Sequence, residues 1–214
     1  MSKQPREFRI GKSFSFLLLV GVIALNLSSC MTVRGSESMN SQVVSKEQFA
    51  NKKIAIFPVK AQTALTTDSL LSLRTALNEK IDDKIKGKLP DSTIIDTKTT
   101  INILNDSGKL EILDDIVRVY ENTGVFDKKL TSSLFNIVKS DYIVFSRLKA
   151  EKMSIAFMGK GFGASLEVVI IGKSQNDVIW GGSGEYKRGG VLGFGTTENK
   201  TAAEELIRLA FQNF

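Results

Sequence analysis

Apolar residues recur at every third or fourth position in five parts of the chain, and this spacing predicts amphipathic helices. The longest of them begins after a capping residue, Thr67 or Asp68, and ends at Gly87 and Pro90. Its apolar stripe consists of Leu70, Leu73, Leu77, Ile81 and Ile85. The other four helices are expected over residues 99–105, 110–120, 128–139 and 201–211.

Five short apolar runs lack a helical period and are rich in β-branched or aromatic residues, which predicts strands. They cover residues 53–59, 93–96, 141–148, 164–171 and 178–186, and the polar residues 173–177 suit a hairpin turn. The resulting order of strands and helices predicts an α/β fold, in which a mixed sheet of about five strands packs against helices. We expect residues 53–214 to form this single domain.

The amino-terminal residues have the three parts of an export signal. Four basic residues precede an apolar stretch over residues 14–27, and the small pair Ser28-Ser29 follows it. The apolar stretch is shorter than the roughly 20 residues that a membrane-spanning helix requires. Residues 1–29 are therefore predicted to be a signal peptide.

Leu27-Ser28-Ser29-Cys30 resembles the lipobox of bacterial lipoproteins, in which the cysteine becomes the lipid-modified first residue of the mature protein. We therefore expect Cys30, the only cysteine, to carry the lipid, palmitate included. The alternatives are an ordinary secretory signal or an amino-terminal anchor helix with an incidental cysteine. Residues 30–52 are polar and lack a period, which predicts a flexible tether. Met31 is not the aspartate that retains lipoproteins at the inner membrane, which favours the outer membrane.

Composition excludes several classes of function. Loss of residues 1–29 removes four basic residues and one glutamate, so the net charge falls from +6 to about +3, too little to indicate nucleic-acid binding. The chain has no histidine, and this argues against most catalytic zinc sites and against serine or cysteine hydrolases. The carboxylate pairs Asp82-Asp83 and Asp114-Asp115 lie in helical patterns, where solvated helix faces explain them better than acid–base catalysis. We expect no enzymatic activity, no metal and no cofactor.

Three segments resemble a superfamily of bacterial envelope lipoproteins that includes CsgG, PelC and LpoB. They are residues 53–59 (KIAIFPV), residues 140–146 (SDYIVFS) and residues 177–184 (DVIWGGSG). The resemblance covers about residues 53–211. It implies an α/β domain similar to the anticodon-binding domain, held in the periplasm by a lipid anchor.

Two segments combine glycine with bulky apolar residues where a surface loop is usually polar. Residues 156–163 contain Phe157, Met158 and Phe162, and residues 189–195 contain Val191, Leu192 and Phe194. An antiparallel strand order places both segments at the same end of the sheet. They predict either an exposed apolar patch that contacts a partner, a neighbouring subunit or lipid, or side chains that fold back onto the sheet.

Together these patterns predict a non-enzymatic envelope lipoprotein, most simply at the outer membrane and facing the periplasm. Its domain would bind another envelope component, most simply a protein, as an accessory or assembly factor. The alternative is a self-assembling ring subunit, a homo-oligomer, of an apparatus that exports polymer or protein.

Overall fold

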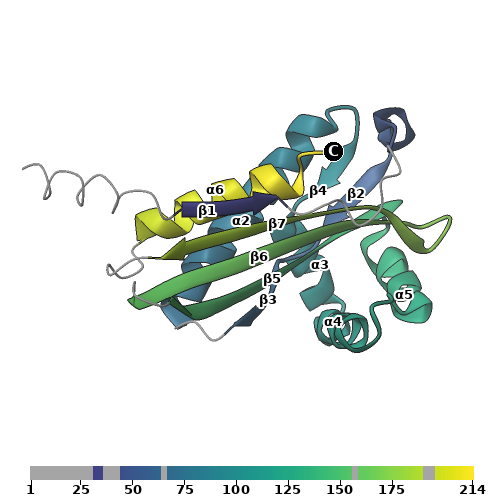
Figure 1. Cartoon of the computed structure of the whole chain (residues 1–214). Coiled ribbons are helices and arrows are strands. Elements are labelled where there is room, and N and C mark those ends of the chain that lie inside the picture. The colour runs from purple at the N-terminus through teal and green to yellow at the C-terminus, as the bar shows by residue number, and fades with distance from the viewer. Residues whose placement is uncertain (1–30, 36–43, 64–66, 156–158, 190–195) are drawn as a thin grey trace, which may run out of the picture. The chain divides into compact units, whose positions relative to one another are not determined.

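Two hydrophobic cores lie on opposite faces of one mixed sheet in this computed structural model, which describes residues 31–35, 44–63, 67–155, 159–189 and 196–214 (Figure 1). The strands are β1 (Met31–Gly35), β2 (Lys53–Ile56), β3 (Lys60–Thr63), β4 (Thr93–Ile95), β5 (Tyr142–Ile155), β6 (Gly159–Gly172) and β7 (Asp177–Gly189). The helices are η1 (Lys46–Phe49), α2 (Thr67–Lys88), α3 (Thr97–Asp106), α4 (Glu111–Thr123), α5 (Lys128–Val138) and α6 (Thr196–Ala210).

The strands follow the order β1-β7-β6-β5-β2-β4, and β3 pairs additionally with β5. β2 is parallel to both β4 and β5, whereas β5, β6 and β7 form an antiparallel meander. The predicted α/β class with a mixed sheet and packed helices is confirmed, and each of the five expected strands is present. The described residues add two strands to that number, because β1 and β3 were not expected.

β3 arises from an interruption next to Pro58. The backbone N–H of Phe57 still donates to Val144 O of β5 at 3.0 Å, but that of Val59 donates to the Asn78 side chain at 2.8 Å. Proline has no N–H to donate, so regular pairing stops there. Pairing resumes at Lys60, opposite Arg147, so one long strand, β5, receives β2 and β3 in succession along the same edge.

Parts of the expected tether, residues 30–52, have regular structure. β1 occupies Met31–Gly35, and η1 follows at Lys46–Phe49. Phe49 is fully buried, and its ring lies 4.7 Å from that of Tyr142. One aromatic residue in a polar segment carries too little periodicity to be recognised, but its burial joins residues 46–52 to the folded body.

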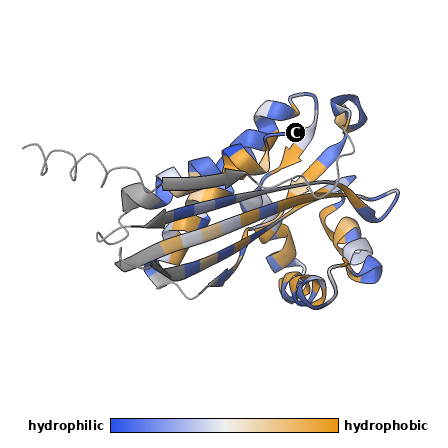
Figure 2. Ribbon diagram, viewed as in Figure 1, coloured by the Kyte–Doolittle hydropathy of each residue, from blue (hydrophilic) through white to orange (hydrophobic). Residues whose placement is uncertain are grey.

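The helices cover the two faces unequally. Helices α2 and α6 lie on one face, and α3, α4 and α5 gather under one half of the other (Figure 1). The predicted stripe of α2 is confirmed, since Leu73, Leu77, Ile81 and Ile85 are all buried in the first core. Hydrophilic residues are interspersed along the part of the sheet that α3–α5 leave uncovered (Figure 2).

At Gly182 and Gly184, helix α6 approaches β7 more closely than a side chain at either position would allow. A Cβ added to Gly182 would lie 2.0 Å from the carbonyl oxygen of Ala210, and one on Gly184 would lie 2.7 Å from that of Leu206. Trp180 on the same strand is buried and stacks on Phe211 at 5.4 Å between ring centroids.

Candidate functional site

The two glycine-rich segments begin at the same end of the sheet. Ile155 pairs with Gly159 where β5 meets β6, and Gly161 pairs with Gly189 where β7 ends. Segments 156–158 and 190–195 therefore begin at the same end of the sheet, from strands on either side of β6, as the antiparallel order predicts. Five of the six residues predicted to bind a partner lie outside the described residues, namely Phe157, Met158, Val191, Leu192 and Phe194.

The sixth residue, Phe162, does not fit an exposed recognition patch. Only 2 % of its surface is exposed, and its ring lies 6.4 Å from that of Tyr186 in the first core. The reason is the period of two in β6, where Phe162, Ala164, Leu166, Val168 and Ile170 all belong to this core. The expected loop is partly a continuation of the strands, and Phe162 is a core residue.

The part of the sheet beyond α4 presents a shallow polar hollow of about 380 Å³. Its charged lining residues are Lys149, Glu151, Glu185 and Lys187, and Lys187 forms an ion pair with Glu185. Two basic and two acidic side chains thus line the hollow. This surface suits contact with a polar macromolecular surface better than it suits enclosure of a small molecule.

A polar network separates this hollow from the second core. Arg147 donates to one carboxylate oxygen of Glu167 from Nε at 3.1 Å and from Nη2 at 2.6 Å. The Tyr120 hydroxyl donates to the other oxygen at 2.5 Å, and the guanidinium carbon lies 5.1 Å from the centre of the Tyr120 ring. Burial, the hydrogen bond to Glu167 and the charge of Glu167 together raise the pKa of Tyr120 to about 12. Tyr120 thus stays protonated near neutral pH and is a poor acid or base for catalysis.

We expect this network to shape the alkaline unfolding of the protein. Because the pKa of Tyr120 is raised from 10.0 to about 12 in the folded chain, the unfolded chain releases this proton first. The stability that Tyr120 contributes is fully present below about pH 10 and is lost as the pH rises to about 12. Tyr120→Phe should therefore lose less stability than the parent over this range, as measured by urea midpoints at about pH 9 and about pH 11.5.

Tyr142→Phe is the matched control, since burial also raises the pKa of Tyr142 but no carboxylate accepts from its hydroxyl, which donates to Gln48 O at 3.2 Å. We expect a smaller change for this variant. Equal losses of stability in the parent and in Tyr120→Phe would contradict the assignment.

Three of the four carboxylates in the two aspartate pairs make hydrogen bonds or ion pairs with other described residues. Asp82 accepts from the backbone and hydroxyl of Thr97 at 3.2 and 2.9 Å, and burial raises its pKa. Half-buried Asp82 is therefore not on a solvated helix face, which corrects the expectation for that residue. Asp114 pairs with Lys60, and Asp115 accepts from Arg118 at 2.7 Å.

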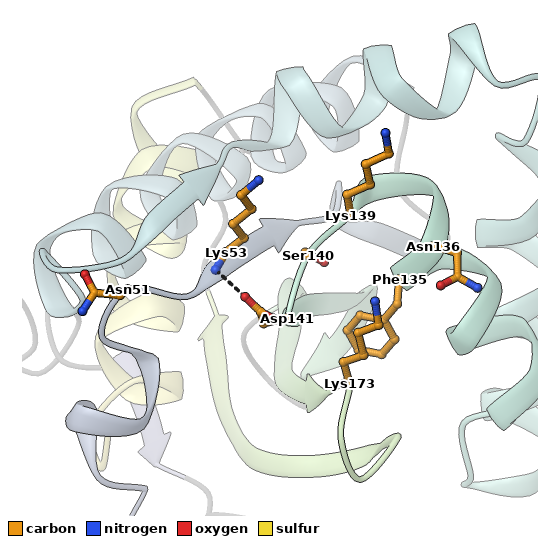
Figure 3. Close-up of a pocket in the computed structure, with 8 residues that line it drawn as sticks. All are labelled: Asn51, Lys53, Phe135, Asn136, Lys139, Ser140, Asp141 and Lys173. Carbon is orange, nitrogen blue, oxygen red and sulfur yellow. Dashed lines mark hydrogen bonds between the residues drawn. The ribbon is translucent and has the colours of Figure 1, made fainter.

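A second pocket, of about 470 Å³, opens at the end of the sheet where β2 and β5 begin (Figure 3). It is lined by Asn51, Lys53, Phe135, Asn136, Lys139, Ser140, Asp141 and Lys173. Asp141 holds its wall together, because its carboxylate accepts from the Lys53 N–H at 2.9 Å and its own N–H donates to Lys53 O at 2.8 Å. Its carbonyl oxygen accepts from the Lys173 N–H at 2.9 Å. Asp141 in the SDY segment thus joins β2, β5 and the β6–β7 turn.

Sequence reasoning missed both the polar network and the lysine pocket. A signal for the network was available, since Arg147 and Glu167 are opposite charges in otherwise apolar strands and lie directly across from each other. The lysines of the pocket come from three distant parts of the chain, and no local pattern connects them. Within the described part of the chain, no group of three or more acidic, cysteine or histidine residues is placed to hold a metal. None of the described helices is both long and apolar enough to cross a membrane.

No family model matches the chain, and no curated protein matches it. Solved structures do resemble it. The PelC dodecamer from Paraburkholderia phytofirmans is 14% identical, with 86% of this chain and 96% of that chain covered and a TM-score of 0.43. The LpoB C-terminal domain from Salmonella enterica is 11% identical, with coverage of 64% and 82% and a TM-score of 0.37. Lipoprotein GNA1162 from Neisseria meningitidis is 8% identical, with coverage of 72% and 94% and a TM-score of 0.40.

PelC and LpoB were both named by the sequence resemblance, and both occur among these similar structures. That this chain belongs to the superfamily of CsgG, PelC and LpoB stays a prediction, and so does its similarity to CsgG.

Proposed function

We propose that this protein is a non-enzymatic lipoprotein of the bacterial cell envelope, whose domain binds another envelope component as an accessory or assembly factor. The observation that carries the proposal is the sequence Leu27-Ser28-Ser29-Cys30 at the end of an export signal, ahead of a folded α/β body. Acyl chains on Cys30 would hold the body at the membrane, and Met31 after the cysteine favours the outer membrane, facing the periplasm.

The partner surface is proposed at the end of the sheet where segments 156–158 and 190–195 begin. Both segments begin at this end, since Ile155 pairs with Gly159 and Gly161 pairs with Gly189. Phe157, Met158, Val191, Leu192 and Phe194 bring bulky apolar side chains to these two segments. The polar hollow that contains Lys149 and Glu185 lies on the same part of the sheet. An apolar centre with a polar surround is the usual composition of a protein interface.

Cys30→Ala should release the protein from membranes, because each buried methylene of an acyl chain contributes about 0.8 kcal/mol to membrane binding. Detergent phase partitioning of the full chain measures this. The parent is expected in the detergent phase and the variant in the aqueous phase. Ser38→Ala changes a residue in the same region but keeps Cys30, so it should partition as the parent does. Detergent-phase recovery of Cys30→Ala would contradict lipid anchoring.

Crosslinking of the full chain in intact cells tests the accessory role. The parent should yield a product heavier than itself by the mass of one different protein, and Cys30→Ala should yield less of it because the variant is no longer held near the membrane. A ladder in multiples of the chain's own mass would instead indicate self-assembly and would contradict the accessory role.

A further inference from the structure

The pocket between β2, α5 and the β6–β7 turn carries an excess of positive charge. Three lysines, Lys53, Lys139 and Lys173, line it together with a single carboxylate, that of Asp141. None of the three ammonium groups forms an ion pair with any residue that the structure describes. The Asp141 carboxylate is already held by the backbone N–H of Lys53. Among the described residues, the lysines thus have no counter-charge committed to them.

The wall of the pocket also contains a hydroxyl without a partner. Ser140 is 2% exposed, and its Oγ makes no hydrogen bond to any described residue. A buried hydroxyl that lacks a hydrogen bond is unfavourable, so such groups are uncommon in folded proteins and require an explanation. Ser140 is one of the residues that line the pocket, so rotation of its hydroxyl toward a ligand oxygen would supply the missing acceptor.

The backbone at Lys139 supports a role for its side chain. Lys139 ends α5 with φ of 52°, in the left-handed region that helix ends usually assign to glycine. A lysine there costs conformational energy that glycine would avoid. Figure 3 shows its side chain extending from the end of α5 away from Ser140 and Asp141, in the same general direction as that of Lys53.

The donors around the pocket are ammonium groups, the amides of Asn51 and Asn136, and one hydroxyl, with no guanidinium. Lysine is a usual ligand of phosphate, which it binds as a compact point charge. We propose that this pocket binds a phosphate group, carried either by a small soluble molecule or by a lipid headgroup. This site goes beyond the proposed accessory function and does not depend on it.

Equilibrium dialysis of the full chain in a neutral detergent against radiolabelled inorganic phosphate, at constant ionic strength, tests the proposal. The parent should bind phosphate saturably, and Lys53→Gln and Lys139→Gly should each weaken binding about tenfold, since a hydrogen bond to a charged group contributes about 1.5–3 kcal/mol. Lys139→Gly relieves the left-handed backbone, so its melting temperature should equal or exceed that of the parent. Loss of binding in this variant is therefore not a loss of folding.

Lys200→Gln is the matched control, because it removes an exposed lysine from α6, which packs on the other face of the sheet. It should bind phosphate as the parent does. Phosphatidic acid added to the micelles identifies the source of the phosphate group. If phosphatidic acid displaces the labelled phosphate at a lower concentration than unlabelled phosphate does, the ligand is a lipid headgroup. If it needs a higher concentration, the ligand is a soluble phosphate. Absence of saturable binding by the parent, or an equal loss in Lys200→Gln, would overturn the proposal.

Discussion

Gly182→Ala is expected to lower the free energy of unfolding by about 3 kcal/mol or more, the upper range for an overpacked core. The new methyl carbon would lie 2.0 Å from the backbone oxygen of Ala210 and 2.9 Å from the Trp180 ring. A backbone oxygen cannot rotate away as a side chain can, so the end of α6 has to move off β7. This movement also separates Phe211 from Trp180, on which it stacks. Urea denaturation of the purified chain measures the loss.

Gly87→Ala is the matched control for this substitution. No atom lies within 4 Å of the position that a Cβ on Gly87 would occupy, and Gly87 belongs to the last turn of α2. Alanine there should raise stability by about 0.5–1 kcal/mol, because glycine is the poorer helix former. Equal stability of Gly182→Ala and the parent would show that α6 does not approach β7 as closely as described.

Phe162→Ser is expected to cost about 3–5 kcal/mol, as is usual when a buried aromatic side chain is truncated. Phe162 is 2% exposed and contacts a core that β5, β6, β7, α2 and α6 share. The variant should melt far below the parent in a thermal denaturation experiment. An unchanged melting temperature would mean that Phe162 is not needed for the core and belongs to the proposed partner surface.

The double variant Phe157→Ser with Phe194→Ser is the counterpart, because it removes aromatic residues from the two segments and leaves Phe162 in place. We expect little change in melting temperature and loss of the crosslinked partner, since aromatic residues dominate the binding energy of interfaces. A large fall in melting temperature would mean that these two residues also cover the core.

The regular elements could be predicted because their periodicity is local. The stripe on α2 and the alternation in β5–β7 each follow from residues within one short segment. Gly124, with φ of 71°, ends α4. β3 escaped prediction, because Lys60–Thr63 is polar and forms a strand only where β5 offers it an edge. η1 escaped for a similar reason, since burial of Phe49 depends on Tyr142 and Phe214, which are distant in sequence.

The site was less predictable than the fold, for two physical reasons. Exposure of an apolar residue depends on which face of a strand it occupies. The residue at which β6 begins could not be located, because the residues there suit both a loop and a strand. Phe162 was assigned to the loop on this account. The lysine pocket depends on three chain segments that meet only in the folded sheet. No single segment contains enough basic residues to indicate it.

The pairing of β2 with β5 has a consequence for how the chain folds. The hydrogen bond from Lys53 to Asp141 joins residues 88 positions apart, and β2 has β4 as its other neighbour in the sheet. By contrast, β5, β6 and β7 are consecutive and pair through a short turn. Contacts close in sequence form first, because closing a long loop costs more entropy. We therefore expect the carboxy-terminal meander to form first and to serve as the template on which β2 pairs with β5.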